Sequence, residues 1–423
     1  MTATTLEQPL DSPAIARRDW KIIGLIGAAH SYSHFYQLVL PTLFLSLANE
    51  FGYSFSELGL LASVFYVVSS IGQASSGFVV DRVGAAPVLR FGLACFVVSG
   101  VLIGLTNGYA MLLLAAFIGG LGNSVFHPVD YSIINHRVSP NRLGHAYSTH
   151  GLTGNLGWAL TPVFMTTIIH LANWRIAVFS AAVLGALVLL AVWLGSELLG
   201  GRKAKRQEAG QPGQAGQAHH KQSVGGTLAT LLAQPTLWGA FFFFVCTSIS
   251  LSAVQNYTIP MLGDVYGIDK VLAGTALSGY MVASAVGLLA GGFLVNSNPR
   301  TEFTVFVSLV LAGVTLIVLA MGMLSSQAAM VLVGVAGFCS GVATPSRDML
   351  IRRAAPKGAT GAVYGLVYSG MDVGSTIGPI VFGVMLDAGL SQGPWAGSAV
   401  TFIIAAIVAL AVARAIARRD ARA

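Results

Sequence analysis

The sequence predicts an all-α membrane protein with twelve transmembrane helices in two pseudo-symmetric six-helix bundles. Three observations predict this class. The 423 residues are 55% hydrophobic and only 9% charged, whereas soluble proteins average roughly 25% charged residues. The apolar residues form runs of about 20 that do not alternate with polar ones, which suits membrane helices and excludes β-barrel strands. Motifs of the first half recur in the second half, which indicates a doubled structure.

Twelve apolar spans are expected along the chain. In the first half they cover residues 21–45, 56–80, 86–105, 109–133, 144–170 and 174–196. In the second half they cover residues 235–261, 270–296, 302–322, 327–350, 360–387 and 395–415.

The domain limits follow from these spans. We expect an N-terminal tail (1–20), a six-helix bundle (21–200), a linker (201–226), a second six-helix bundle (227–415) and a C-terminal tail (416–423). The linker is basic at first and then rich in Gly, Gln and Ala, which is typical of a flexible connection. Its adjacent histidines, His219 and His220, are expected to be solvated rather than to bind a metal ion.

Basic residues gather on one side of the predicted membrane. They precede span 1, follow each even-numbered span and end the chain, as Arg17, Arg137 and Arg353 illustrate. The other side carries Arg175 and Lys270. By the positive-inside rule, both termini are cytoplasmic, and we expect a multi-pass protein of a bacterial-type inner membrane. Because this topology explains the net charge of +7, no nucleic-acid partner is expected.

The loop between spans 2 and 3 carries a candidate gating motif. It reads G-x-x-x-D-R-x-G with a trailing basic residue, and consists of Gly77, Asp81, Arg82, Gly84 and Arg90. This pattern resembles the loop between transmembrane helices 2 and 3 of the major facilitator superfamily. A weaker copy in the second half, at residues 292–297, has Asn-Ser in place of Asp-Arg. The resemblance implies that Asp81 contacts the start of span 11, near Gly361, and latches the outward-open state.

Prolines and glycines recur at matching places in the two halves. Pro128 in span 4 matches Pro345 in span 10, and Pro41 and Pro260 close spans 1 and 7. A proline inside a helix removes a hydrogen bond and bends the helix. We therefore expect both halves to share one bent-helix architecture. The pairs Phe51-Gly52 and Tyr266-Gly267, and Gly157 and Gly374, match in the same way.

Polar side chains lie on one face of spans 1, 4, 7 and 10, because spacings of three and four residues share a helix face. An ionisable group inside the membrane is costly, so such groups point to a substrate or proton pathway. The candidates in these spans are His30, His34, Gln37, Asn123, His127, Asp130, Gln255, Asn256, Arg347 and Asp348. His150 in span 5 and Asp372 in span 11 complete the set.

The family resemblance implies that these four spans line a central cavity. A structural alternative applies to several of these residues. Serines such as Ser248, Ser252 and Ser340 commonly bond neighbouring helices and do nothing else. His127 with Asp130 can form an interfacial hydrogen-bond network, and Arg347 with Asp348 can neutralise each other without contacting substrate.

No cofactor or metal site is expected. His30 and His34 have the i, i+4 spacing of metal ligands, but no Glu accompanies them in an H-E-x-x-H pattern. With no strands, no nucleotide-binding glycine motif has its required context, so an ATP-driven pump has no support.

Two stretches narrow the resemblance to the fosmidomycin-resistance branch of the superfamily. Residues 29–61 contain a histidine-bearing helix that runs into Leu-Pro, and residues 119–132 contain a Gly-rich stretch that leads into Phe-His-Pro. The resemblance implies proton-coupled export of a small, anionic or drug-like molecule by alternating access. We expect a monomer in membrane lipid whose partners are that substrate and protons.

Four residues are candidates for proton coupling: His34, His127, Asp130 and Asp372. Histidine titrates near neutral pH, and a carboxylate does so when it is desolvated. Arg347 is expected to hold an anionic group of the substrate, or to pair with Asp130 when the cavity is empty.

Two alternatives remain. One is a proton-coupled uptake symporter for an organic anion or a metal chelate. The other is a membrane-embedded enzyme built on the histidine cluster, which would form product without moving it across the membrane.

Overall fold

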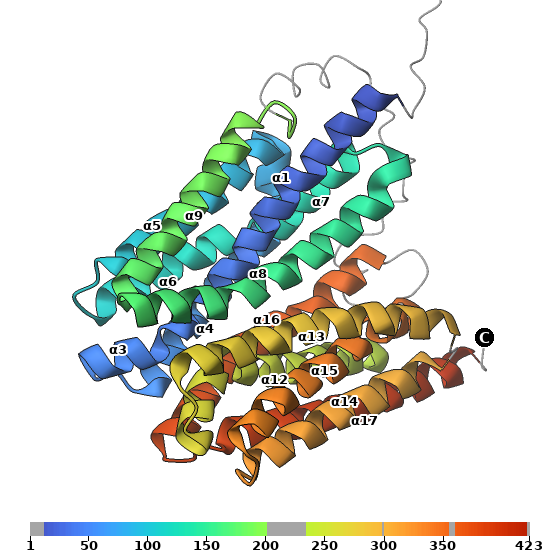
Figure 1. Ribbon diagram of the computed structural model, residues 1–423. Coiled ribbons are helices and arrows are strands. Elements are labelled where there is room, and N and C mark those ends of the chain that lie inside the picture. The colour runs from blue at the N-terminus through green and yellow to red at the C-terminus, as the bar shows by residue number, and fades with distance from the viewer. Residues whose placement is uncertain (1–11, 201–233, 298–299, 355–359, 421–423) are drawn as a thin grey trace, which may run out of the picture.

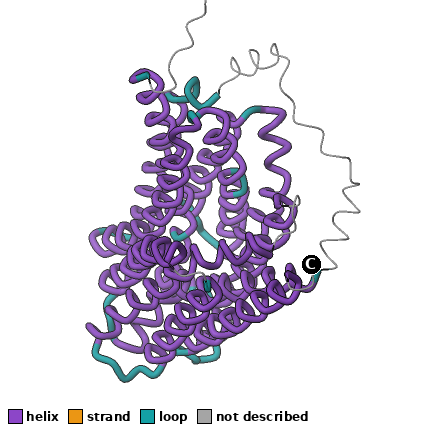
Figure 2. The backbone as a smooth tube through the Cα atoms, turned by 90° about the vertical axis from the view of Figure 1, so that its right-hand side faces the viewer, coloured by secondary structure: helices purple, strands orange, loops and turns teal. Residues whose placement is uncertain are grey.

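The computed structural model describes residues 12–200, 234–297, 300–354 and 360–420, and every regular element in them is a helix (Figure 2). The first half contains α1 (Pro13–Gln37), α2 (Val39–Thr42), α3 (Phe44–Phe51), α4 (Phe55–Val83), α5 (Ala85–Gly104), α6 (Tyr109–Asn123), α7 (Phe126–Arg137), the 3-10 turn η1 (Pro140–Arg142), α8 (Leu143–Leu171) and α9 (Trp174–Leu194). The second half contains α12 (Pro235–Tyr266), α13 (Lys270–Ser297), α14 (Thr301–Ala320), α15 (Ser326–Ala354), α16 (Thr360–Asp387) and α17 (Gly393–Asp420).

The twelve-span fold class is confirmed. Among the described residues, ten spans are long and apolar enough to cross a membrane. The other two consist of α1 with α2 and α3, and of α8. Their mean hydropathy is lower because they carry polar side chains such as His30, His34 and His150. The expected linker, 201–226, lies outside the described residues.

The terminal helices are longer than the sequence analysis expected. α1 begins within the expected N-terminal tail, because Pro13 suits the first helical position and Ser12 Oγ accepts the N–H of Ile15 at 3.3 Å. α17 likewise continues past the expected boundary at residue 415 and ends at Asp420.

The helices around the matched prolines of spans 1, 4, 7 and 10 are interrupted in the first half and continuous in the second. In the first half the helices break next to proline: α1 ends at Gln37, four residues before Pro41, and α6 ends at Asn123, five before Pro128. Proline has no N–H with which to bond the preceding turn. In the second half α12 and α15 continue through their prolines. α12 continues six residues beyond Pro260 to Tyr266, so this proline does not close span 7.

Other matches between the halves are confirmed. Gly52 ends α3 and Gly267 ends α12, both in the left-handed conformation, with φ of 74° and 64°. A Cβ on Gly157 would lie 2.0 Å from Ser31 O of α1, and one on Gly374 would lie 2.5 Å from Val245 O of α12. Matched glycines therefore bring α8 onto α1 and α16 onto α12.

The two halves meet at one end and diverge toward the other (Figure 1). We call the diverging end, which carries Arg18, Arg137 and Arg419, the basic end, and the other the opposite end. At the opposite end α4 packs on α16, and α8 packs on α13. Ser63 Oγ donates to Thr376 O at 2.6 Å, and Ser278 Oγ accepts the N–H of Val163 at 3.2 Å. These bonds join the halves at the opposite end.

Candidate functional site

A cluster of ionisable side chains lies inside the first half, where α1, α7 and α8 meet. It consists of His30, His34, His127, Asp130 and His150, and we call it the histidine cluster. Small residues on α8 make room for it. A Cβ on Gly154 would lie 2.9 Å from His30 Nε2 and 3.0 Å from His34 Cε1. Glycine at this position therefore lets the two imidazoles of α1 pack against the backbone of α8.

Asp130 is the anionic centre of the cluster and is fully buried, with 0% of its side chain exposed. His150 Nε2 and His30 Nδ1 each lie 3.1 Å from Asp130 Oδ2. The contact with His150 has hydrogen-bond geometry. His30 Nδ1 and Asp130 Oδ1 are buried atoms without a hydrogen-bond partner. A carboxylate in the membrane interior is costly unless it is compensated, and here the adjacent groups are imidazoles.

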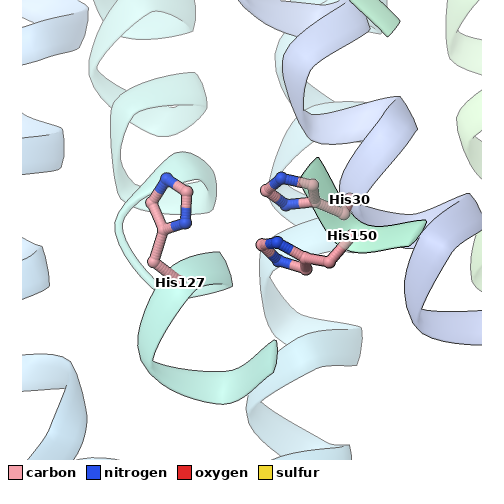
Figure 3. Close-up of side chains that lie close together, drawn as sticks. All are labelled: His30, His127 and His150. Carbon is pink, nitrogen blue, oxygen red and sulfur yellow. The ribbon is translucent and has the colours of Figure 1, made fainter. Parts of the chain in front are cut away.

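The histidine rings of the cluster lie close together, and Figure 3 shows three of them, with His30 and His150 side by side and His127 facing them. His30 stacks on His150 with centroids 3.5 Å apart, and His127 meets His30 edge-on at 5.3 Å. His34 lies 4.4 Å from His30 and 4.2 Å from Trp158, measured between ring centroids. One ring nitrogen from each of His30, His127 and His150 lies within 4.8 Å of the other two. Within the described parts of the chain, these three are the residues that could hold a metal ion.

A second polar network lies next to the cluster, at the two broken helices. Gln37 Nε2 donates to Asn123 Oδ1 at 3.0 Å, and Trp158 Nε1 donates to Gln37 Oε1 at 3.0 Å. Asn123 Nδ2 donates in turn to Ser69 Oγ at 2.8 Å. Gln37 and Asn123 are the last residues of α1 and α6, so the proline-linked breaks place two predicted site residues against each other.

The charged pair of the second half has partners of its own. Arg347 Nε donates to Asp348 Oδ1 at 2.9 Å, and Tyr368 Oη donates to the same oxygen at 3.2 Å. The guanidinium lies 5.0 Å from the centre of the Phe244 ring. The expected pairing of Arg347 with Asp130 is not present in this structure, because a neighbour on the same helix neutralises Arg347 and Asp130 lies among histidines.

Gln255 and Asn256 are buried on α12. Asn256 Nδ2 donates to Ser252 O at 2.8 Å, whereas Asn256 Oδ1 and Gln255 Nε2 have no hydrogen-bond partner. Neither residue is joined to the histidine cluster by an observed contact.

Asp372 lies at the boundary between the halves. It is half-buried on α16 and faces Ser70 and Tyr66 of α4. It shares a helix face with Thr376, the residue whose carbonyl accepts from Ser63 of α4. Asp372 is one turn closer to the basic end, where the halves begin to separate.

The gating motif lies at the basic end of α4. Gly84 links α4 to α5 with φ of 97°, a left-handed conformation that favours glycine. Asp81 lines a cavity of about 180 Å³ together with His136 and Arg137. Arg82 follows in the last turn of α4, Gly77 lies two turns from its end, and Arg90 Nε donates to Ala86 O at 3.3 Å on α5. The expected neighbours of Asp81 near Gly361 lie outside the described side chains.

Sequence reasoning missed two carboxylates at the helix ends. Asp387 of α16 accepts the N–H of Phe55 at 2.7 Å and of Ser56 at 2.8 Å, at the start of α4. Asp387 ends span 11, just as Asp81 lies near the end of span 2. A comparison of these two helix ends in the sequence could have identified Asp387 as a candidate. Asp19 of α1 is buried at the basic end, and bonds to Ser139 hold it there.

A fold of two six-helix halves with ionisable groups at membrane depth defines a secondary transporter. The chain belongs to the Major Facilitator Superfamily, whose family model matches residues 25–257 and 249–422. It is similar to the fosmidomycin resistance protein of Escherichia coli K12, with 33% identity over 178 residues that cover 42% of this chain and 43% of the relative. It is also similar to the membrane sensor protein UhpC of Salmonella typhimurium LT2, with 25% identity over 279 residues and 61% of each chain covered.

These matches span about two fifths and three fifths of the two curated relatives. Among solved structures, a bacterial homologue of the human lysosomal transporter Spinster, in an inward-facing and occupied conformation, superposes with a TM-score of 0.73. That match has 13% identity and covers 93% of this chain and 96% of the other. At this identity the likeness shows the fold alone. The Major Facilitator Superfamily is a family of transporters, not of enzymes, and the chain's membership in it argues against the enzyme alternative.

Proposed function

We propose that this chain exports a small anionic or drug-like molecule in exchange for protons, by alternating access, as a monomer in a bacterial inner membrane. Similarity to a fosmidomycin resistance protein supports export. The two halves are bonded to each other at the opposite end and diverge toward the basic end. This arrangement supports alternating access, in which the site is reached from one side of the membrane at a time. The proposal keeps two six-helix bundles joined by a linker at 201–226, with the first and last helices extended to Pro13 and Asp420.

The basic end faces the cytoplasm in this proposal. Arg18, Arg137 and Arg419 lie there, and basic residues favour the cytoplasmic side. Both chain ends then lie in the cytoplasm, and the conformation described is inward-open.

Arg347 is the proposed anion-binding group. Its side chain is 20% exposed, and its only close acidic neighbour among the described residues, Asp348, is 44% exposed. A guanidinium is always charged and suits bidentate contacts with carboxylate or phosphate groups. An anionic substrate would therefore compete with Asp348 for Arg347.

Asp372 is the proposed coupling group, and its position is the observation that carries the proposal. A coupling group must be reachable from each side in turn, and Asp372 lies on the α4–α16 boundary beside Ser70. His34, His127 and Asp130 were the other candidates from the sequence. His34 and Asp130 are buried within one half, and all three belong to the cluster, so we assign coupling to Asp372.

A drug-tolerance assay tests export directly. A drug-sensitive bacterial host would express the chain, its Arg347→Gln variant, or Lys270→Gln as a charge control at the opposite end. With fosmidomycin as the probe, we expect the parent and Lys270→Gln to raise the tolerated concentration, and Arg347→Gln to lose that effect. Lowered tolerance in cells with the parent would instead indicate uptake and refute export.

A further inference from the structure

Three histidines from three separate helices converge at one point in the first half. His30 comes from α1, His127 from α7 and His150 from α8, and their rings approach one another (Figure 3). One nitrogen of each lies within 4.8 Å of the others. Three imidazole nitrogens bound to one zinc ion at 2.0–2.1 Å would lie about 3.4 Å apart. Because His30 and His150 stack, their rings must turn out of the stack for all three nitrogens to bind one ion.

Asp130 lies next to the candidate ligands, as the supporting carboxylate of a metal site does. A histidine that binds a metal ion usually gives its other ring nitrogen to a carboxylate, which fixes the orientation of the ring. One ring nitrogen of His30 and one of His150 each lie 3.1 Å from Asp130 Oδ2, and the contact of His150 has hydrogen-bond geometry. His150, one of the three candidate ligands, thus already has a carboxylate partner of this kind.

The burial and the charge of Asp130 also favour a bound cation at this site. Asp130 is fully buried, and its Oδ1 has no hydrogen-bond partner. Unpartnered buried polar atoms are rare and call for an explanation such as a bound ion. A divalent cation between the imidazoles would compensate the charge of this carboxylate.

We propose that His30, His127 and His150 form a binding site for a divalent transition-metal ion, with Asp130 as the positioning residue. Imidazole ligands suit Zn²⁺, Cu²⁺ and Ni²⁺, whereas Mg²⁺ and Ca²⁺ require oxygen ligands. The ion would tie α1 and α8 to α7, beyond the break in span 4. This site revises the expectation from the sequence that no metal is bound. It was not visible there because its three ligands lie far apart along the chain.

Zinc binding to the purified full-length chain tests this site. The parent for the test carries His219→Ala and His220→Ala, which removes the adjacent histidines of the linker, and has no polyhistidine tag. After chelator treatment, calorimetric titration with Zn²⁺ should give one saturable site per chain, and Co²⁺ should give visible absorption from nitrogen ligands. No saturable binding would overturn the proposal.

Two variants and one control assign the ligands. His127→Ala should abolish the Co²⁺ absorption, whereas His136→Ala, an exposed histidine on the same helix, should leave it unchanged. Asp130→Asn should weaken Zn²⁺ binding by about 10–100-fold without changing the stoichiometry. Since this variant keeps all three ligands, it tests the site even if His127→Ala fails to fold. Equal binding by all three variants would place the metal elsewhere and refute the assignment.

Discussion

The carboxylate of Asp387 accepts the backbone N–H of Ser56 at 2.8 Å, so the last residue of α16 holds the first turn of α4. It also accepts from Phe55 at 2.7 Å. A carboxylate is favoured at a helix N-terminus, where N–H groups lack partners in the helix. The two helices belong to different halves, so this contact fastens the opposite end. It is the counterpart of the contact expected for Asp81 at the basic end.

Asp387→Asn should release this contact and favour opening of the opposite end. Loss of a carboxylate at a helix end shifts a two-state equilibrium by about two- to fivefold. Spin labels at Leu171 and Met323, which are exposed at that end of the two halves, report the change as a longer distance population. Asp264→Asn, an exposed acid at the same end, is the control and should leave the distances unchanged. Identical distance distributions for Asp387→Asn and the parent would contradict the role of the contact.

Gly157→Ala should destabilise the first half. The added Cβ would lie 2.0 Å from Ser31 O, a backbone atom that cannot move without shifting α1. Overpacking of this kind costs about 1–3 kcal/mol. Gly151→Ala on the same helix meets no atom within 4 Å and should be neutral or stabilising, because alanine favours helix. Thermal unfolding in detergent should separate the two variants, and equal melting temperatures would rule out the close packing of α1 on α8.

Asp19 should contribute stability that depends on pH. Burial alone favours its protonated form, but the bonds from Ser139 and the adjacent Arg18 outweigh burial and lower the pKa of Asp19. Because the folded-state pKa is the lower one, this stability is fully present above the ordinary pKa of aspartate, about 3.9, and is lost as the pH falls through the folded-state value.

Asp19→Asn should therefore reduce the free energy of unfolding at pH 7, by about 1.5–3 kcal/mol for hydrogen bonds to a charged group. The difference from the parent should shrink below pH 4. Melting curves across this range provide the measurement, and a difference that stays constant with pH would argue against the depressed pKa.

The fold was predictable because its signals are local. Apolar runs define the spans, and matched glycines such as Gly157 and Gly374 identify the repeat. The breaks near Pro41 and Pro128 were not predictable as breaks, because Pro260 and Pro345 stay within continuous helices. Whether a proline ends a helix depends on the packing around it, and that packing is not a property of the local sequence.

The candidate site was predictable in part. Helical spacing placed His30 and His34 on one face, and it placed His127 and Asp130 on another. The contact of Asp130 with His150 and the stacking of His30 on His150 depend on how α1, α7 and α8 pack. For Arg347 the sequence predicted a partner that is not observed. Arg347 occupies the position in the second half that Asp130 occupies in the first, which suggested an ion pair between them. The structure pairs Arg347 with the adjacent Asp348 on the same helix instead.

Proton-coupled exchange through Asp372 is the central claim, and flux in proteoliposomes tests it most directly. A gradient of one pH unit corresponds to about 1.4 kcal/mol per proton, so exchange for one proton can sustain about a tenfold substrate gradient. With labelled fosmidomycin as the probe, the parent and the Asp264→Asn control should accumulate it about tenfold when the gradient is imposed. Asp372→Asn should still equilibrate the probe but should not respond to the gradient. Accumulation by Asp372→Asn equal to that of the parent would contradict the account.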